Sequence, residues 1–243
     1  MNFLLHRHLA ARDLAADGAD AVDSEIAGIG AMLPDLWAMA DRAVRPRSGI
    51  GWPPGLDTPT RSLLIGVEHH LRADAWFHRH PVFVEGDAAL ARAFRAAPIT
   101  ARKMGLFGHI GWELCLDGAL VRRLGLDTVL DQLRQGLERT GPKALDAASG
   151  VHHPAFQDDP DARERFRVRV ADLFASLLAG GWIEGYQHGH GLAARLSGVR
   201  RRIGLPPLSA ADLDTLAAPL DAAVERADGG LDALFADPID PST

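Results

Sequence analysis

Two segments of the chain place histidines and carboxylates four residues apart inside an otherwise apolar pattern. The two triplets are His70, Asp74, His78 and His109, Glu113, Asp117. Residues four apart lie on the same face of a helix, about 6 Å apart between Cβ atoms, so each triplet forms a column. Each column continues an apolar face, and a buried imidazole or carboxylate costs free energy unless it is paired, hydrogen-bonded or bound to a metal. The spacing therefore predicts columns of metal ligands inside a helical core.

Further candidate ligands lie elsewhere in the chain. His6 and His8 stand near the start, and Asp35 follows a Leu-Pro pair that favours a kink or a helix restart. Metal sites in helical folds are built from carboxylates and imidazoles that project inward from several helices. A single histidine is more often a structural residue than a ligand. The joint arrangement nevertheless favours a metal site over a set of satisfied polar residues.

Composition excludes several classes of protein. The formal net charge is −6, and nucleic-acid binding usually needs a basic surface. Cys115 is the single cysteine, so an intramolecular disulfide cannot form. No stretch approaches the ~18 apolar residues of a membrane span. We therefore expect a cytoplasmic protein without nucleic-acid or membrane partners, and the oligomeric state stays open.

The pattern of apolar residues is helical almost throughout and predicts an all-α fold. The expected helices cover about 2–15, a stretch from Ser24 with a kink near Pro34, 60–79, 86–96, 100–123, 127–139, 160–179, 182–203 and a stretch from Ser209. Gly and Pro mark 45–59 as a loop, and 148–158 reads as an ordered or functional loop. The expected organisation is one domain over 1–243, with a core over about 1–205 and a C-terminal helical appendage over about 206–243.

Basic residues near the end of the core form a second candidate site. Arg195 precedes the run Arg200, Arg201, Arg202. Such a cluster can bind phosphate or an anionic partner. It can equally complement the dipole at the end of a helix. The sequence carries no nucleophile elbow, phosphate-binding loop, dinucleotide fingerprint or HExxH motif that would indicate another chemistry.

Several segments, in order, resemble the acyl-carrier-protein phosphodiesterase family, a divergent branch of the HD-domain phosphohydrolases. MNFLLHRHLA is similar to the family's opening segment, GAMLPDLW aligns Asp35 with its aspartate, and GVEHHLRADAWFHRHP aligns His70, Asp74 and Pro81. LFGHIGWELCL falls where the family has a D-x-x-x-D-H segment, and WIEGYQHGHGLAARLSGVRRR aligns Trp182 and Tyr186. The resemblance covers residues 1 to about 205.

The chain departs from the family pattern at several positions of the expected site. His78, His109 and Glu113 stand where the family has aspartate, and Leu114 stands where it has histidine. These changes move the ligand set toward nitrogen, which suits Fe, Zn or Mn more than Mg. A metal site therefore looks retained, while the reaction of the family is open.

The resemblance implies an HD-like bundle of about eight to nine helices that hydrolyses the phosphodiester between 4′-phosphopantetheine and a serine of acyl carrier protein. It implies a divalent metal, Mn or Fe first and Zn as an alternative. The implied ligands are His6, Asp35, His70, His109 and Glu113, with His8 and His78 as second choices. Asp74 and His70 are the implied catalytic residues. Arg195, Arg200, Arg201 and Tyr186 are the candidate substrate-binding residues.

Three other readings stay open. The first is a helical iron enzyme of the oxygenase type on an HD-like scaffold, since His and carboxylate ligands suit both chemistries. The second is a homologue that keeps the fold and binds metal without catalysis, which the change at Leu114 favours. The third is a plain helical scaffold protein. The partner that the resemblance implies is acyl carrier protein or another phosphopantetheine-containing molecule.

Overall fold

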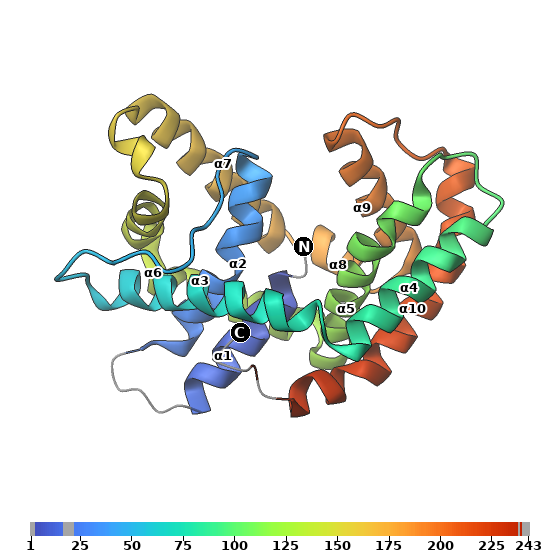
Figure 1. Ribbon diagram of the computed structural model, residues 1–243, viewed down its shortest axis with the longest axis horizontal. Helices are drawn as coiled ribbons and strands as arrows, with labels where there is room; N and C mark the ends of the chain where they lie inside the picture. The colour runs from blue at the N-terminus through green and yellow to red at the C-terminus, as the bar shows by residue number, and fades with distance from the viewer. Residues whose placement is uncertain (1–2, 17–21, 238, 240–243) are drawn as a thin grey trace. The chain divides into compact units, whose positions relative to one another are not determined.

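The computed structural model describes residues 3–16, 22–237 and 239, and all regular structure within them is helical (Figure 1). The α-helices are α1 (Phe3–Ala16), α2 (Ser24–Ala40), α3 (Thr58–Phe77), α4 (Pro81–Ala96), α5 (Gly108–Leu124), α6 (Leu126–His152), α7 (Pro160–Leu178), α8 (Gly181–Gly185), α9 (Gly189–Arg202) and α10 (Ala210–Ala236). Short 3₁₀ turns cover Met104–Phe107 and Pro154–Gln157. The predicted all-α fold is confirmed. Among the described residues, every helix is too short or too polar to span a bilayer.

The backbone divides into two compact units, each built from segments that are distant in the sequence. The α1 unit comprises Phe3–Ala75 and Asp127–Ala179, and the α5 unit comprises Trp76–Leu126 and Gly180–Asp240. The α1 unit holds α1, α2, most of α3, nearly all of α6, and α7. The α5 unit holds α4, α5, α8, α9 and α10. The predicted division into a core and a C-terminal appendage stays a prediction.

Two glycines bring α2 and α3 into close contact in the α1 unit. A Cβ atom on Gly66 would lie 1.9 Å from the carbonyl oxygen of Ala27, and one on Gly30 would lie 2.2 Å from that of Leu63. Any side chain at these positions would push the helices apart, so the glycines allow backbone-to-backbone packing. Pro34 lies inside α2, which is one helix over Ser24–Ala40, so the helix does not restart there, and the expected kink stays a prediction. This contact between α2 and α3 positions the candidate metal ligands His70 and Asp74 of α3.

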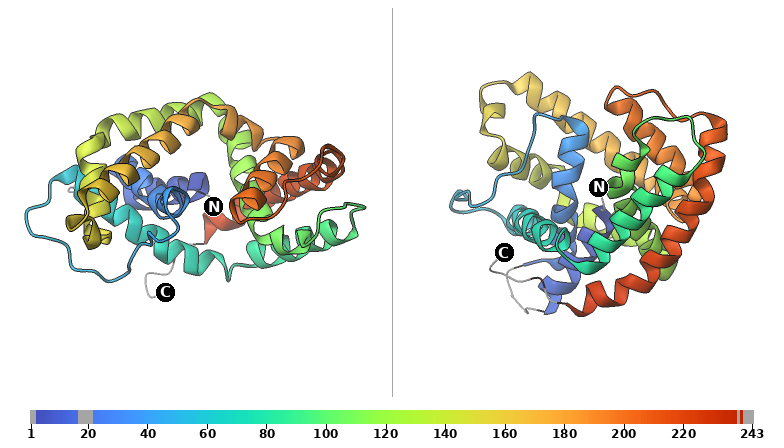
Figure 2. Two further views of the ribbon diagram at one scale, coloured as in Figure 1. Left: turned by 90° about the horizontal axis from the view of Figure 1, so that it is seen from above. Right: turned by 45° about the vertical axis from the view of Figure 1, so that its right-hand side comes forward.

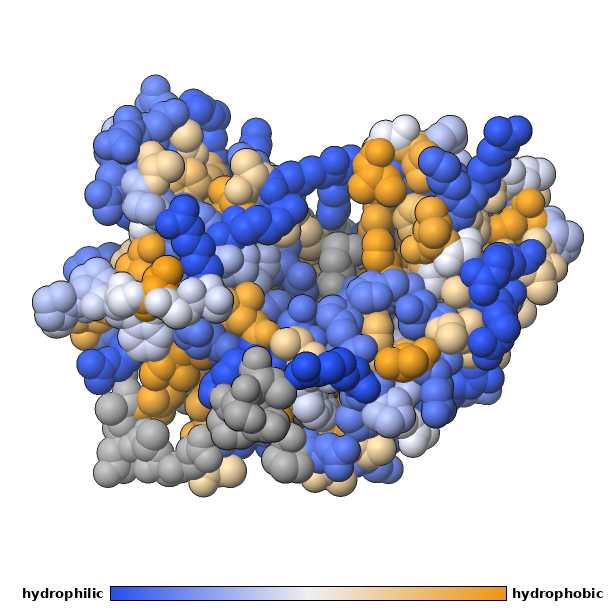
Figure 3. Space-filling model, in the orientation of Figure 1, coloured by the Kyte–Doolittle hydropathy of each residue, from blue (hydrophilic) through white to orange (hydrophobic). Residues whose placement is uncertain are grey.

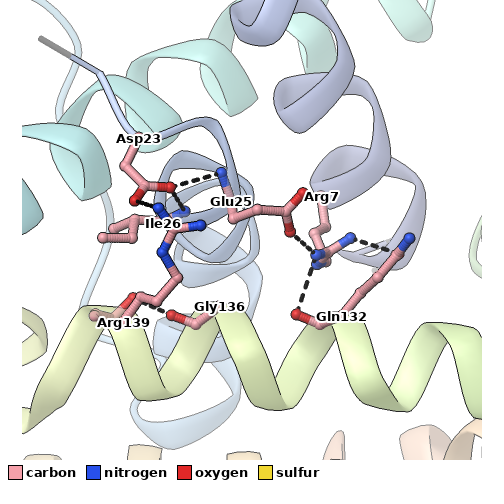
Figure 4. Close-up of polar contacts among 8 residues, drawn as sticks. Arg7, Asp23, Glu25, Ile26, Gln132, Gly136 and Arg139 are labelled. Carbon is pink, nitrogen blue, oxygen red and sulfur yellow. Dashed lines mark hydrogen bonds and ion pairs between the residues drawn. The ribbon is translucent and has the colours of Figure 1, made fainter.

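A buried arginine joins three helices of the same unit (Figure 4). Arg7 on α1 donates to the side chain of Glu25 on α2 at 2.5 Å and to the side chain of Gln132 on α6 at 2.9 Å. Asp23 caps α2 by accepting from the backbone of Ile26 at 3.2 Å, and it also forms an ion pair with Arg139 of α6. These contacts fix the end of α1 that carries His6.

In the α5 unit, α10 packs along α4, α5 and α9 (Figures 1 and 2). Gly118 of α5 allows a close approach, since a Cβ atom there would lie 2.0 Å from the carbonyl oxygen of Tyr186. Arg123 at the end of α5 reaches α10, where it forms ion pairs with Asp228 at 3.0 Å and Asp232 at 2.5 Å. The stretch expected to form an appendage therefore supplies a helix that α5 packs against.

Several helices begin or end at other residues than expected, because a capping residue or a close contact at a glycine sets the boundary. α4 begins at Pro81 instead of residue 86, because His80 accepts a hydrogen bond from the backbone of Val82 at 3.2 Å and Pro81 occupies the first turn. α5 begins at Gly108 instead of about residue 100, after a loop and a 3₁₀ turn.

Two further boundaries depend on contacts that are remote in sequence. α6 extends through a kink at Gly141 to His152, so the first part of the expected 148–158 loop is helical. The expected helix over 182–203 is divided into α8 and α9. Gly189 and Gly191 at this break approach the carbonyls of Ala217 and Gly185 so closely that a Cβ atom would clash.

Candidate metal centres

The α1 unit brings together two imidazoles and one carboxylate. His6 comes from α1, and His70 and Asp74 come from successive turns of α3. Each residue offers one ligand atom, and these atoms lie within 4.8 Å of one another. The His6 and His70 rings are 4.0 Å apart between centroids, and His6 Nε2 lies 3.9 Å from Asp74 Oδ1. We call this group the α1 cluster.

A hydrogen bond fixes the tautomer of His70. Its Nδ1 lies 2.8 Å from the carbonyl oxygen of Ala31, and a carbonyl can only accept, so Nδ1 carries the proton. Nε2 is then the nitrogen with a lone pair. This is the usual arrangement of a metal-ligating histidine, whose other ring nitrogen donates to a carbonyl or carboxylate. Burial lowers the pKa of His70, which favours the neutral, ligating form, although the charges of Asp35 and Asp74 act to raise it.

The α1 cluster is buried on one side and open on the other. His6 is 1% exposed and His70 is 5% exposed, whereas the Asp74 side chain is 41% exposed. Ligands bound to zinc at about 2.0–2.1 Å in tetrahedral geometry are roughly 3.4 Å apart, so small side-chain movements would close the site. Three protein ligands on an open face leave coordination positions for water or substrate. The donor set therefore fits a divalent transition metal.

Asp35 lies close enough for its charge to act on His70, yet it does not join the α1 cluster. Its carboxylate raises the pKa of His70 against the effect of burial. It is absent from the residues whose ligand atoms converge within 4.8 Å. Asp35 stands one turn after Ala31 on α2, so the helix that supplies the carbonyl for His70 also supplies this charge. In this structure it serves as an electrostatic neighbour of the cluster.

The α5 unit holds a second group of the same composition. His78 lies in the turn after α3, and His109 and Glu113 are four residues apart on α5. The Nε2 atoms of His109 and His78 lie 3.3 Å and 3.5 Å from the same oxygen, Glu113 Oε1. The three ligand atoms again lie within 4.8 Å of one another. We call this group the α5 cluster.

Neighbouring side chains orient the two imidazoles of the α5 cluster. Phe83 of α4 packs edge-on against both rings, with centroid distances of 4.7 Å to His78 and 4.9 Å to His109. Asp87 Oδ2 lies 4.0 Å from His109 Nδ1, on the side of the ring that faces away from Glu113. This distance is too long for a hydrogen bond, so Asp87 is a charged neighbour of the ring.

The α5 cluster holds a buried carboxylate, Glu113. Burial acts to raise the pKa of its carboxyl group, but the opposing causes, which include hydrogen bonds from His109 and His78, hold the pKa well below its ordinary value. The residue is 4% exposed. A buried carboxylate is stable only with positive charge or donors around it, and the two imidazoles or a metal can supply this.

Each predicted column is only partly retained. His70 and Asp74 converge as expected, but α3 ends at Phe77, so the turn carries His78 into the α5 cluster. His109 and Glu113 also converge, whereas Asp117 is buried outside both groups. The first column fails at its third step because α3 ends before His78, whereas Asp117 remains on α5 and is nevertheless absent from both groups.

The remaining candidate residues take other places. His8 is in neither cluster, and burial, followed by the charges of Arg12 and Arg7, lowers its pKa. Tyr186 is buried. Arg200 is also buried, where its guanidinium donates to backbone carbonyls. Arg195 stacks on Trp182 at 5.1 Å, and Arg201 is exposed at the end of α9.

Sequence reasoning missed the partners that orient the ligands. The Ala31 carbonyl leaves no sequence signal, because any residue type presents a backbone oxygen. Phe83 and Asp87 lie four residues apart on α4, which places them on one face of that helix. That spacing is a signal, but only the packing of α4 on α5 shows which face meets His109.

No family model, curated protein or solved structure matches this chain. The resemblance to the acyl-carrier-protein phosphodiesterase family therefore stays a prediction that depends on the quoted motifs.

Proposed function

We propose that this protein is a divalent-metal-dependent phosphodiesterase with its reaction centre at the α1 cluster. The observation that carries the proposal is the convergence of one ligand atom each from His6, His70 and Asp74 within 4.8 Å, with His70 also donating through Nδ1 to the Ala31 carbonyl. A hydrogen-bonded polar network needs no such convergence of ligand atoms. A metal site does, since each ligand must present a lone pair to the same ion.

The residues of the α1 cluster have separate parts in the proposed reaction. The buried imidazoles of His6 and His70 would hold the metal, which supplies Lewis acidity toward the phosphoryl oxygen and lowers the pKa of a bound water. Asp74 is the exposed member of the group. Its carboxylate can complete the ligand set and accept a hydrogen bond from the attacking water. Mn or Fe suits this mixed set of nitrogen and oxygen donors, and Zn is the alternative.

The substrate that we propose follows from the sequence motifs. His6, Asp35, His70 and Asp74 occur in the order of the acyl-carrier-protein phosphodiesterase family, and three of the four form the α1 cluster. We therefore propose the phosphodiester between 4′-phosphopantetheine and a carrier-protein serine as the bond that is hydrolysed. Leu114 stands where the family has a histidine, so the substrate can differ from that of the family. A related phosphoester is therefore the alternative substrate.

A second candidate function has support from the same ligand set. Two histidines and one carboxylate with open positions are also typical of non-haem iron oxygenases. This candidate predicts iron in the purified protein and a reaction that requires oxygen. The phosphodiesterase predicts the same rate with and without oxygen.

The test combines metal content with hydrolysis. Wild type, Asp74→Asn and the control His190→Asn are purified and measured for metal by plasma mass spectrometry. Hydrolysis of bis(4-nitrophenyl) phosphate and of holo acyl carrier protein is then assayed with Mn²⁺. We expect Asp74→Asn to lose at least a hundredfold in turnover. The control should keep its activity, because His190 is exposed and pairs with Asp214 at the surface.

Hydrolysis that is absent in wild type with Mn²⁺, Fe²⁺ and Zn²⁺ would contradict the proposal. Bound metal without turnover would leave a metal-binding protein that lacks this reaction.

A further inference from the structure

One end of the α5 unit gathers positive charge without any carboxylate in the surrounding sequence. Residues 88–112 contain Arg92, Arg95, Arg102 and Lys103 but no Asp or Glu, and residues 185–211 contain Arg195, Arg200, Arg201 and Arg202 but no Asp or Glu. The whole chain carries a formal net charge of −6. A local concentration of cations in an acidic protein creates a surface that attracts anionic partners.

The two acid-free segments lie side by side. The buried guanidinium of Arg200 donates to the backbone carbonyl of Arg102 at 2.9 Å and to that of Pro206 at 3.0 Å. It also lies over the ring of Phe107 at 5.5 Å. Arg200 therefore holds the end of α9 against the loop that precedes α5, and the exposed cations of both segments share one end of the unit. We call the exposed Arg95, Arg102, Lys103, Arg201 and Arg202 the basic end.

The carboxylate that follows the second of these segments, Asp212, is turned inward. Asp212 is 4% exposed and accepts hydrogen bonds from the Thr100 backbone at 2.7 Å and from the Thr100 hydroxyl at 2.9 Å. The carboxylate of Asp212 therefore holds the loop before the 3₁₀ turn and does not add exposed negative charge at the basic end.

Apolar side chains interrupt the basic end. Leu106 is 75% exposed and Ile203 is 50% exposed. A groove of about 400 Å³, lined by residues that include Phe94, Ile99 and Leu106, lies beside Arg95 and Lys103. Figure 3 shows hydrophobic and hydrophilic surface interleaved over this end of the unit. An apolar groove that is rimmed by charged side chains is the kind of surface that protein partners bind.

The backbone at Lys103 supports a functional reading of this loop. Lys103 has φ of 67°, and it is the one non-glycine among the described residues with positive φ. A long side chain in the left-handed region is uncommon and is retained where the surrounding structure holds it. Here the conformation sets a cation at the edge of the groove.

We propose that the basic end and its groove dock an acidic amphipathic helix of a partner protein. Carboxylates of that helix would face the arginines, and one apolar side chain would enter the groove beside Leu106. The identity of the partner, acyl carrier protein, rests on the proposed function. Nucleic acid fits less well, because its phosphates gain nothing from the exposed Leu106 and Ile203.

The test uses holo acyl carrier protein as the probe and measures Kd by fluorescence anisotropy at low and moderate salt. The triple variant Arg95→Glu, Arg102→Glu, Lys103→Glu reverses exposed charge at the basic end. The control Arg45→Glu, Arg61→Glu, Arg165→Glu makes the same change of charge at exposed positions of the α1 unit. We expect the first triple variant to raise Kd about tenfold or more, moderate salt to weaken wild-type binding, and the control to bind within about twofold of wild type.

Three results would overturn the docking proposal. The first is that wild type does not bind acyl carrier protein, and the second is that the two triple variants change Kd equally. The third is that the charge reversal at the basic end weakens binding of an RNA oligonucleotide but leaves binding of acyl carrier protein unchanged. Hydrolysis of bis(4-nitrophenyl) phosphate separates this proposal from the proposed function. Charge-dependent binding without any hydrolysis would support the docking proposal and contradict the phosphodiesterase function. Hydrolysis together with charge-independent binding would support the phosphodiesterase function and contradict the docking proposal.

Discussion

The hydrogen bond between His70 and the Ala31 carbonyl places the proton of the imidazole on Nδ1 and leaves the lone pair on Nε2. The residue types and the four-residue spacing of His70 and Asp74 are visible in the sequence, and their convergence follows from the helix. The participation of His6 needs α1 to lie against α3, as the 4.0 Å contact between the His6 and His70 rings shows, and sequence spacing cannot predict that contact. The sequence therefore predicts the ligand types at this cluster, while the choice of partners depends on tertiary packing.

Replacing His70 with asparagine removes a ligand and a buried hydrogen-bonding ring. We expect His70→Asn to weaken Zn²⁺ binding at the α1 cluster by at least a hundredfold. We also expect a loss of about 1–3 kcal/mol in the free energy of unfolding, because the Ala31 carbonyl loses its donor. Isothermal calorimetry and urea unfolding measure the two effects, with His190→Asn as the control at an exposed histidine. A loss of stability with unchanged Zn²⁺ affinity would show that His70 is a core residue only.

His152 and His153 should make the stability of the α1 unit fall at acid pH. Burial, followed by neighbouring positive charge, lowers the pKa of each to about 4. The folded state therefore favours their neutral forms. Their contribution to stability is complete above the ordinary histidine pKa of about 6.5 and is lost as the pH falls toward 4.

We expect the free energy of unfolding to fall by up to about 1.4 kcal/mol per pH unit for each of these histidines between pH 6 and pH 4.5. Urea unfolding at a series of pH values measures the slope. The variant His152→Gln should have a shallower slope than wild type over this range. An unchanged slope in that variant would mean that other groups cause the acid sensitivity.

At the scale of the helices, the crossing of α2 and α3 controls the geometry of the α1 cluster. A methyl group at Gly66 would collide with the Ala27 carbonyl, so Gly66→Ala must separate the two helices. We expect a loss of about 3 kcal/mol in the free energy of unfolding. Zn²⁺ binding should weaken as well, because α2 carries the Ala31 carbonyl that orients His70. Urea unfolding and calorimetry test both effects.

The control for this change is Gly198→Ala on α9, where nothing lies within 4 Å of an added Cβ atom. This variant should gain about 0.5–1 kcal/mol, because alanine loses less backbone entropy in a helix than glycine. Equal stability of the two variants would show that the α2–α3 crossing tolerates a side chain.

Most helices could be predicted from the sequence, and their ends less well. The apolar pattern of α3 and α7 gives the helix and nearly its limits, because amphipathic periodicity is local. The break between α8 and α9 is not local, since Gly189 is set by the Ala217 carbonyl on α10. The start of α4 at Pro81 depends on His80, a histidine that serves as a cap. Histidine is outside the usual set of capping residues, so the sequence pattern did not indicate it.

Across the whole molecule, the candidate ligands fall into two groups with the same composition. The sequence suggested a common set that included His6, His70, His109 and Glu113, whereas the α1 cluster and the α5 cluster belong to different compact units. The chain passes from the α1 unit to the α5 unit after Ala75, between Asp74 and His78. The end of α3 thus divides the first predicted column between the two groups.

This division predicts two separable metal-binding events per chain. Saturating Zn²⁺ at about a hundred times Kd stabilises a folded unit by about 2.7 kcal/mol through mass action, provided that the unfolded chain does not bind the metal. Each cluster should therefore stabilise the unit that holds it. His109→Asn should remove one equivalent and leave the equivalent that depends on His70, and the double variant should bind none.

Calorimetric titration gives the stoichiometry, and thermal unfolding followed by circular dichroism gives the stabilisation, with excess chelator as the metal-free reference. A single equivalent that both single variants abolish would mean that the histidines of both groups serve one bound metal. In that case the ligands that the sequence grouped together would act together, and Glu113 would belong to the same centre as Asp74.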